Sequence, residues 1–242
     1  GISAAIAGFA VNNMLLVAVG AIVGAAGFIL TRIMCAAMNR SLSRILAGAT
    51  TTSPAAAPPA EAESTEAEAD KTERPDPATL LKEAQSVIIV PGYGMALSQA
   101  QGQVKQLADT LQQQGKTVKF AIHPVAGRMP GHMHVLLAEV DVPYDMLFEM
   151  DAVNDEFAAT DLVIIVGAND VVNPAASTAE NTPIYGMPIL KAGEANHVIV
   201  CNLDDKPGYA GVPNSLYEQD NALLMQGNAA ETLRELLACI VQ

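Results

Sequence analysis

The chain has 242 residues, with 13 Lys and Arg against 26 Asp and Glu, and a formal net charge of −13 at pH 7. This acidic balance argues against a general nucleic-acid binder, which needs a basic face to neutralise phosphates. Cys35, Cys201 and Cys239 show no CxxC or metal-like spacing, and each lies among apolar residues. They are typical of buried thiols in a reducing compartment and give no support to a disulfide scaffold.

The first 48 residues form a membrane segment, with a transmembrane helix expected at about 14–34. The run from Met14 to Ile33 is apolar apart from Thr31 and Arg32, and about 20 helical residues span roughly 30 Å. A signal peptide is the main alternative, but the run is long and rich in glycine. Three arginines lie at or beyond the carboxyl end of the run, which predicts that this end faces the cytoplasm or the equivalent organelle matrix. They are Arg32, Arg40 and Arg44.

Small residues recur along one side of this helix at Gly20, Gly24 and Gly27. Such a strip permits close approach of a neighbouring helix, so we expect packing against other membrane helices. The residues from Ile2 to Val11 are interpreted as the end of a preceding span, and we expect the chain to be a fragment or one piece of a split protein. Asn12 and Asn13 then form an interfacial turn, or alternatively polar groups inside a bundle.

Residues 49–78 are rich in Ala, Pro, Thr and Glu and have no hydrophobic period. We expect a flexible acidic linker, because such a composition cannot bury enough apolar surface to offset chain entropy. Residues 79–242 instead alternate apolar runs with turn signals and are long enough for a globular core.

This second part has a β/α pattern and predicts a doubly wound parallel sheet, so the fold class is α/β with a preceding transmembrane helix. The expected strands are residues 86–90, 117–122, 145–149, 161–166, 197–201 and 222–226. The expected helices are residues 78–83, 95–114, 132–139, 152–159 and 229–241.

The most informative stretch is the turn after the first strand, where Gly92 and Gly94 precede a helix. A Gly-x-Gly turn in this position can hold a pyrophosphate against free N–H groups at a helix N-terminus. Leu97 occupies the position of the third glycine in the usual fingerprint. A tight strand-to-helix turn without a ligand therefore remains an alternative.

Three further loops follow predicted strands, at residues 123–132, 167–174 and 202–211, and could line one crevice with the glycine turn. Arg128 lies among glycines and prolines and could present its guanidinium to a phosphate, or only tie down the loop. Asp170 could bind a ribose or an amide, or cap the following turn. His123, His132 and His134 have no carboxylate or thiol partner at ligand spacing, so no metal site is predicted.

Several motifs occur in the same order as in a known protein family. Through them the chain resembles the C-terminal part of the β subunit of proton-translocating nicotinamide nucleotide transhydrogenases. The resemblance covers the last membrane helix and essentially all of residues 79–242. The motifs are Ala36–Ser41, Pro91–Ala96, Gln99–Gln101, Ile122–His132, Val142–Asp145, Gly167–Asp170, Gly186–Pro188 and Gly208–Val212.

The resemblance implies that this domain binds NADP(H) in reversed orientation and exchanges hydride with NAD(H) on a partner subunit, coupled to proton translocation. It also implies further membrane helices, a dimeric assembly, and a multi-pass protein of the inner membrane with this domain in the cytoplasm or organelle matrix. Asp170 matches the family acid that couples nucleotide binding to proton transfer. The expected nucleotide contacts are Gly92, Tyr93, Gly94, Met95, Ala96, Val125, Ala126, Gly127, Arg128, Met129, Pro130, Gly167, Ala168, Asn169, Asp170, Val171, Asn202, Asp204, Lys206, Pro207, Gly208, Tyr209, Gly227 and Asn228.

One departure from the family concerns the loop after residue 201, where the usual Lys-Arg-Ser grips the 2′-phosphate. Here Asn202, Leu203 and Asp204 occupy those positions, followed by Asp205 and Lys206. Carboxylates repel a 2′-phosphate and suit a free 2′-hydroxyl, so either Lys206 replaces the missing charge or the domain prefers NAD(H). A membrane-tethered module that senses redox state without turnover is the alternative function.

Overall fold

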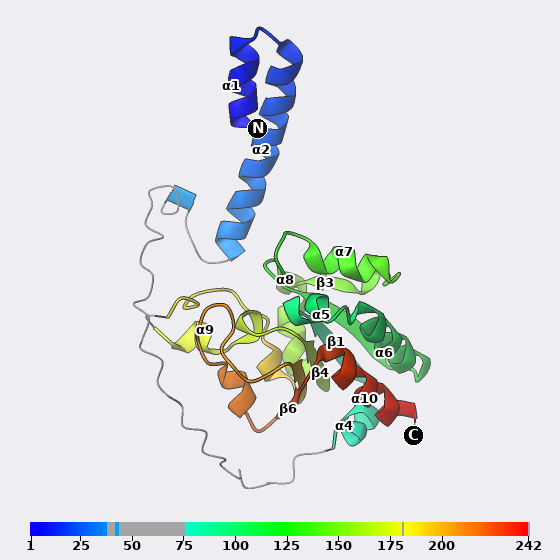
Figure 1. Cartoon of the computed structure of the whole chain (residues 1–242). Coiled ribbons are helices and arrows are strands. Elements are labelled where there is room, and N and C mark those ends of the chain that lie inside the picture. The colour runs from blue at the N-terminus through cyan, green and yellow to red at the C-terminus, as the bar shows by residue number, and fades with distance from the viewer. Residues whose placement is uncertain (38–41, 44–75, 181, 242) are drawn as a thin grey trace. The chain divides into compact units, whose positions relative to one another are not determined.

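The computed structural model describes residues 1–37, 42–43, 76–180 and 182–241, and the chain divides into two compact units at residues 68 and 69 (Figure 1). Each unit is described by itself. The acidic linker expected at residues 49–78 lies outside the described residues except for its last three positions. Arg40 and Arg44, which helped to predict the membrane orientation, also lie outside them.

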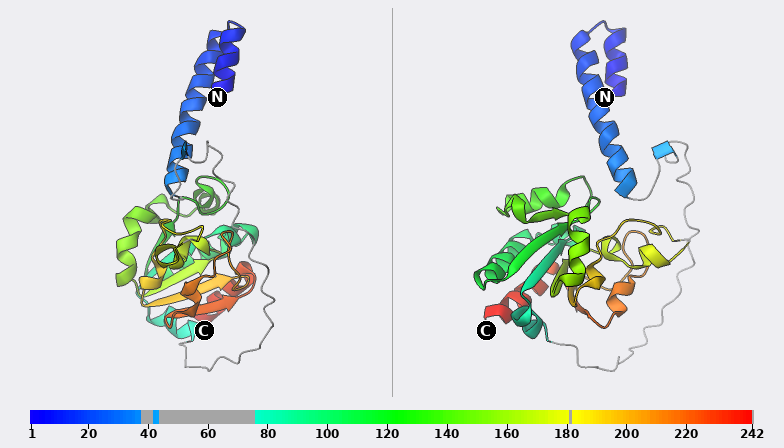
Figure 2. Two further views of the ribbon diagram at one scale, coloured as in Figure 1. Left: turned by 90° about the vertical axis from the view of Figure 1, so that its left-hand side faces the viewer. Right: turned by 180° about the vertical axis from the view of Figure 1, so that it is seen from behind.

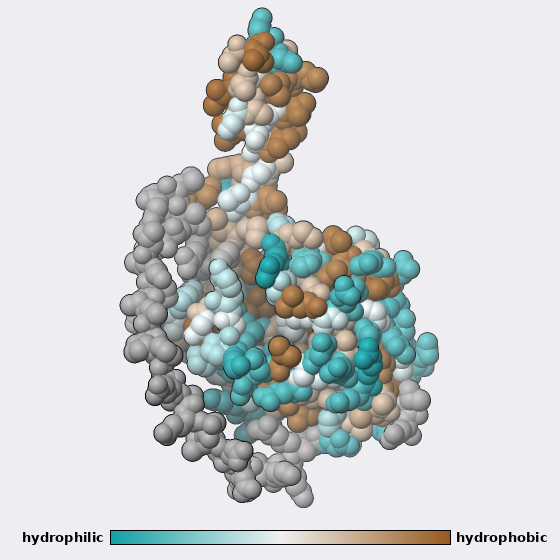
Figure 3. Space-filling view, viewed as in Figure 1, coloured by the Kyte–Doolittle hydropathy of each residue, from teal (hydrophilic) through white to brown (hydrophobic). Residues whose placement is uncertain are grey.

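The first unit is a helical hairpin of α1 (Ile2–Ala10) and α2 (Met14–Ala37). Helix α2 is long and apolar enough to cross a membrane, and apolar side chains cover much of the hairpin surface (Figure 3). The turn between the helices contains Asn12, with φ of 52°, and Asn13, whose Oδ1 accepts a hydrogen bond from the Leu16 N–H at 3.1 Å. The asparagine pair therefore forms a turn, as the sequence predicts, and Asn13 caps α2.

The glycines of α2 divide between two environments. A Cβ atom on Gly20 would lie 2.5 Å from the Ala5 nitrogen, and one on Gly24 would lie 3.3 Å from Ile2. These two positions let α1 and α2 approach closely, which is the role expected of small residues between membrane helices. Gly27 has no described atom within 4 Å of such a Cβ, so the hairpin itself makes no use of it.

The second unit is built on a six-stranded parallel sheet in the order β3-β2-β1-β4-β5-β6 (Figures 1 and 2). The strands are β1 (Ser86–Pro91), β2 (Thr117–Ile122), β3 (Leu147–Glu149), β4 (Leu162–Val166), β5 (His197–Asn202) and β6 (Ala222–Gln226). The predicted α/β fold with a parallel sheet is confirmed. The chain order reverses between β1 and β4, and in such sheets a ligand crevice forms at this switch point, outside the carboxyl ends of the strands.

Alternate side chains of the buried strands pack on opposite faces of the sheet. Val87 and Ile89 belong to one core cluster, whereas Ile88 and Val90 belong to the other. The first face is covered by α4 (Pro77–Glu83), α5 (Tyr93–Leu97), α6 (Gln101–Gln113), α7 (His132–Glu139) and α10 (Ala229–Val241). The second face is covered by α8 (Met150–Val153) and by the 3₁₀ turns η3 (Asn154–Ala159), η5 (Ala192–Glu194) and η6 (Ser215–Glu218).

The structure corrects three of the predicted elements. The helix expected at 95–114 is two helices, α5 and α6, separated at Gln99, which has φ of 51°. The strand expected at 145–149 begins as a 3₁₀ turn, η2 (Tyr144–Met146), and only β3 is extended. The helix expected at 152–159 is α8 followed by η3. The long loop after β4 also contains short turns, η4 (Asp170–Val172) and α9 (Ala175–Thr178).

Candidate functional site

Two glycines of the first strand-end turn contact the backbone of the loop after β4. A Cβ atom on Gly92 would lie 2.3 Å from the Gly167 carbonyl oxygen, and one on Gly94 would lie 2.7 Å from the Gly167 Cα. Gly167 itself has φ of 68°, a conformation that favours glycine. These glycines are therefore required by the close approach of two loops of the same chain at the switch point.

The backbone N–H groups of this turn are largely occupied. Gly92 N–H donates to Val166 O at 2.8 Å, Gly94 N–H to Gly167 O at 2.9 Å, and Met95 N–H to Gly92 O at 3.2 Å. The expectation that these N–H groups are free to hold a pyrophosphate is wrong for these three. An anion bound at this edge of the sheet must be contacted by groups other than these three N–H groups.

Arg128 supplies a cation next to the glycine turn. Its guanidinium carbon lies 4.6 Å from the centroid of the Tyr93 ring, and Tyr93 is the first residue of α5. The backbone of the Arg128 loop is fixed by His132, whose Nδ1 accepts the Arg128 N–H at 3.2 Å. Gly127, with φ of 96°, allows the imidazole to pack against the loop. The stacking holds a planar, permanently charged donor at the switch point.

His123 connects the same loop to a segment that the site prediction left out. Its Nδ1 accepts a hydrogen bond from Val125 N–H at 3.2 Å, and its Nε2 lies 2.8 Å from the carbonyl oxygen of Pro188. A neutral ring protonated at Nε2 satisfies both contacts. Burial lowers the pKa of His123, which favours this neutral form, although the hydrogen bond to Pro188 acts in the opposite direction.

Asp170 connects the loop after β4 to the loop after β5. Its Oδ2 accepts the Ala210 N–H at 2.9 Å, and a Cβ atom on Gly208 would lie 2.6 Å from its Oδ1. Oδ1 is buried and has no hydrogen-bond partner among the described residues. Burial raises the pKa of Asp170, while the hydrogen bonds from the Ala210 and Tyr209 backbone partly oppose the shift. A carboxyl group in this setting can hold a proton above its usual pH range.

A network of amide side chains fixes the remaining loops. Asn202, the last residue of β5, donates from Nδ2 to Ala168 O at 2.9 Å and to the Tyr217 hydroxyl at 2.6 Å. Asn169 donates to Lys206 O at 3.0 Å and is itself held by Asn214, at 3.2 and 3.1 Å. Asn214 and Tyr217 were not expected from the sequence. Their signal is weak, because an isolated Asn or Tyr before a strand is ordinary turn chemistry.

The loop after β5 carries charges that are close to one another. Lys206 Nζ lies 3.3 Å from Asp204 Oδ2, and the Lys206 N–H donates to Asp204 Oδ1 at 3.3 Å. Leu203 and Tyr209 are exposed in this loop. At the end of β6, Gly227 N–H donates to Asn202 O at 2.9 Å, and Asn228 Oδ1 accepts from Ala230 N–H at the start of α10.

The sequence of the whole chain identifies the family to which the protein belongs. The family model for the NAD(P) transhydrogenase beta subunit matches residues 1–239. The chain belongs to this family. Two curated relatives named NAD(P) transhydrogenase subunit beta come from Rhodospirillum rubrum and from its strain ATCC 11170, and each is 46% identical over 238 residues. The alignment covers 98% of this chain and 51% of each relative, so the chain spans about half the length of these relatives.

A solved structure, that of an exopolyphosphatase-related protein from Bacteroides fragilis, aligns with 67% of this chain and 42% of its own at 15% identity and a TM-score of 0.33. This likeness is too low to support an argument. The membership in the transhydrogenase beta family therefore rests on the sequence comparisons.

In this transhydrogenase family member, the expected site residues all lie at or just beyond the carboxyl ends of β1, β2, β4, β5 and β6. Contacts join the glycine turn to Gly167 and Ala168, Tyr93 to Arg128, Asn169 to Lys206, and Asp170 to Gly208 and Ala210. Met129 and Pro207 are both exposed at the surface. Among the described residues, no group of three or more His, Cys, Asp or Glu side chains is placed to hold a metal ion.

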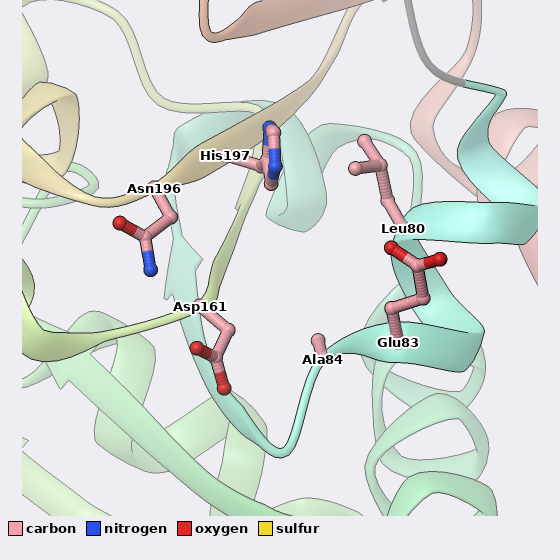
Figure 4. Close-up of a pocket in the computed structure, with 6 residues that line it drawn as sticks. All are labelled: Leu80, Glu83, Ala84, Asp161, Asn196 and His197. Carbon is pink, nitrogen blue, oxygen red and sulfur yellow. The ribbon is translucent and has the colours of Figure 1, made fainter.

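A hollow of about 390 Å³ lies at the opposite, amino edge of the sheet (Figure 4). It is lined by Leu80, Glu83, Ala84, Asp161, Asn196 and His197. Asp161 already accepts hydrogen bonds from the backbone of Gln85 and Ser86 and from the Ser86 hydroxyl, and these contacts lower its pKa. The carboxylate therefore joins β1 to the start of β4, and the hollow is distinct from the candidate nucleotide site.

Proposed function

We propose that residues 79–242 are the nucleotide-binding domain of a proton-translocating transhydrogenase, which exchanges hydride with a nucleotide on a partner subunit. The observation that carries this proposal is the family match, which runs through both the apolar hairpin and the parallel sheet. The resemblance implies NADP(H) in this domain and NAD(H) on the partner. The two dinucleotides are identical apart from the 2′-phosphate, so contacts to the rest of the molecule do not distinguish them.

The residues at the switch point suit the body of a dinucleotide. Arg128 provides a permanent cation for a phosphate, and Tyr93 restricts where that cation can move. Asn169, held by Asn214, and the half-buried Asp170 provide polar groups beside them. The bound nucleotide supplies the hydride chemistry, while this chain positions the nucleotide and limits access of water.

Asp170 is the proposed coupling group, as the family resemblance implies. The carboxyl group holds the backbone of the loop after β5 through Ala210, and its pKa is raised by burial. A change in its protonation changes the strength of this hydrogen bond, so proton uptake and loop position are linked. Helix α2 is the proposed last span of the membrane domain. Further spans, a dimeric assembly and placement of the soluble domain in the cytoplasm or organelle matrix belong to the same proposal.

The test is direct deuteride transfer by the complete protein in its membrane with its partner subunit. NADH deuterated at C4 is mixed with NADP⁺ or with thio-NAD⁺, and the product is analysed by mass spectrometry. Deuterium recovered in the reduced acceptor, with no exchange with water, supports the proposal. Nucleotide binding without any transfer supports the redox-sensing alternative.

A further inference from the structure

The charges around the candidate site do not fit a nucleotide with an additional phosphate. The loops that follow β1, β2, β4 and β5 comprise residues 92–96, 123–131, 167–174 and 203–211. Their permanent cations are Arg128 and Lys206, and their carboxylates are Asp170, Asp204 and Asp205. A pyrophosphate can take Arg128 as its partner, but a second phosphate group then depends on Lys206.

Lys206 is not available as an unopposed cation. Its ammonium lies 3.3 Å from the Asp204 carboxylate, and Asp205 stands between these residues in the chain. The three side chains together carry a net negative charge when ionised. A phosphate brought to this loop gains one attraction and meets two like charges, so its binding is opposed.

Asn202, the residue that precedes this loop, offers a hydrogen-bond acceptor. Asn202 is 7% exposed, its Nδ2 is committed to Ala168 O and the Tyr217 hydroxyl, and its Oδ1 is buried without a donor among the described residues. A buried acceptor without a donor is costly and is relieved by a hydroxyl or water. A ribose 2′-hydroxyl can donate a hydrogen bond, whereas an ionised 2′-phosphate ester cannot.

We propose that this domain selects a dinucleotide with a free ribose 2′-hydroxyl, NAD(H), over one with a 2′-phosphate. The proposal rests on the proposed function for the location of the site and changes the nucleotide that the family resemblance implies. Hydride exchange between two NAD(H) molecules leaves the nucleotide pools unchanged.

The test is titration of the complete chain in detergent with NADH and with NADPH, at low and high ionic strength, followed by nucleotide fluorescence. We expect NADH to bind about tenfold more tightly than NADPH, a difference of about 1.4 kcal/mol. The preference should shrink as salt screens the carboxylates. NADPH binding as tight as NADH binding, or tighter, overturns the proposal and leaves the proposed function intact. Binding of neither nucleotide overturns both.

Two variants locate the cause of the preference. Asp204→Asn removes the carboxylate paired with Lys206 and should tighten NADPH binding about threefold, which narrows the preference for NADH. Asp220→Asn makes the same charge change in the exposed turn before β6, at the amino edge of the sheet, and should alter neither affinity. Equal effects of the two variants on NADPH affinity would show that only the net charge of the protein matters. That result would overturn the assignment of the preference to the loop after β5.

Discussion

The carboxylate of Asp170 accepts a hydrogen bond from the Ala210 N–H at 2.9 Å and thereby joins the loops that follow β4 and β5. The second oxygen of the same carboxyl group is buried without a partner among the described residues. One titratable group therefore holds two loops of the candidate site together.

Asp170→Asn should flatten the pH dependence of nucleotide release. The amide keeps an acceptor for Ala210 but cannot titrate. In the native protein the raised pKa of Asp170 means that its favourable contribution to folding is complete below the ordinary value of 3.8 and is lost as the pH rises through the raised value. Nucleotide release rates are measured by stopped-flow fluorescence from the ordinary pKa of 3.8 up through the raised pKa. They should vary with pH in the native protein and vary less in the variant.

Asp220→Asn serves as the control for removal of one carboxylate, since Asp220 is exposed at the amino edge of the sheet. It should leave the pH profile of release unchanged. Identical profiles for native protein and Asp170→Asn would exclude Asp170 as the titrating group.

Gly92→Ala should destabilise the second unit, which carries the parallel sheet, and weaken nucleotide binding. The added Cβ would lie 2.3 Å from the Gly167 carbonyl oxygen, which is too close without movement of the backbone. Overpacking of this kind costs about 1–3 kcal/mol, measurable by urea denaturation. Gly102→Ala is the matched control, because a Cβ at this position in α6 meets nothing within 4 Å. That control should stabilise the helix by up to about 1 kcal/mol, and equal losses in both variants would contradict the packing argument.

The contrast between these glycines shows what the sequence could and could not predict. Apolar runs such as Val87–Val90 predict the strands, because a parallel sheet covered on both faces leaves no polar alternation. The six-stranded architecture and the loops that carry the site followed from this pattern. Pattern alone could not show that Gly92 and Gly94 face the backbone of Gly167, which lies more than seventy residues away in the sequence. Steric demands between distant loops are set by tertiary packing.

Local conformation was also hard to predict where tertiary contacts decide it. The interruption between α5 and α6 falls at Gln99, a residue with good helix propensity, so propensity predicted one continuous helix. His123 and Pro188 meet through a side chain and a carbonyl 65 positions apart, and no local signal marks such a pair. The family resemblance placed Asp170 in the site, whereas its partner Ala210 required the structure.

Arg128→Ala should weaken nucleotide binding about tenfold and reduce its dependence on salt. The substitution removes the cation stacked on Tyr93, and a charge-assisted contact to phosphate contributes about 1.5–3 kcal/mol. Arg234→Ala removes an exposed guanidinium from the interior of α10, which begins at Ala229, and should leave affinity unchanged. Affinities are obtained by titration at low and high ionic strength. A nucleotide affinity that survives Arg128→Ala would mean that Arg128 only ties down its own loop.

His123→Gln should remove part of the acid sensitivity of the second unit. Burial lowers the pKa of His123, so its contribution to folding is present above the ordinary value of 6.5 and is lost as the pH falls through the lowered value. Protonation also removes the Nδ1 acceptor of the Val125 N–H. The loss approaches about 1.4 kcal/mol per pH unit for one proton, measured by urea denaturation between neutral and mildly acid pH. His197→Gln, at the half-buried start of β5, is the matched control, because it leaves the contact between His123 and Pro188 in place. An unchanged slope in His123→Gln, where the contact with Pro188 has been removed, would show that another group titrates.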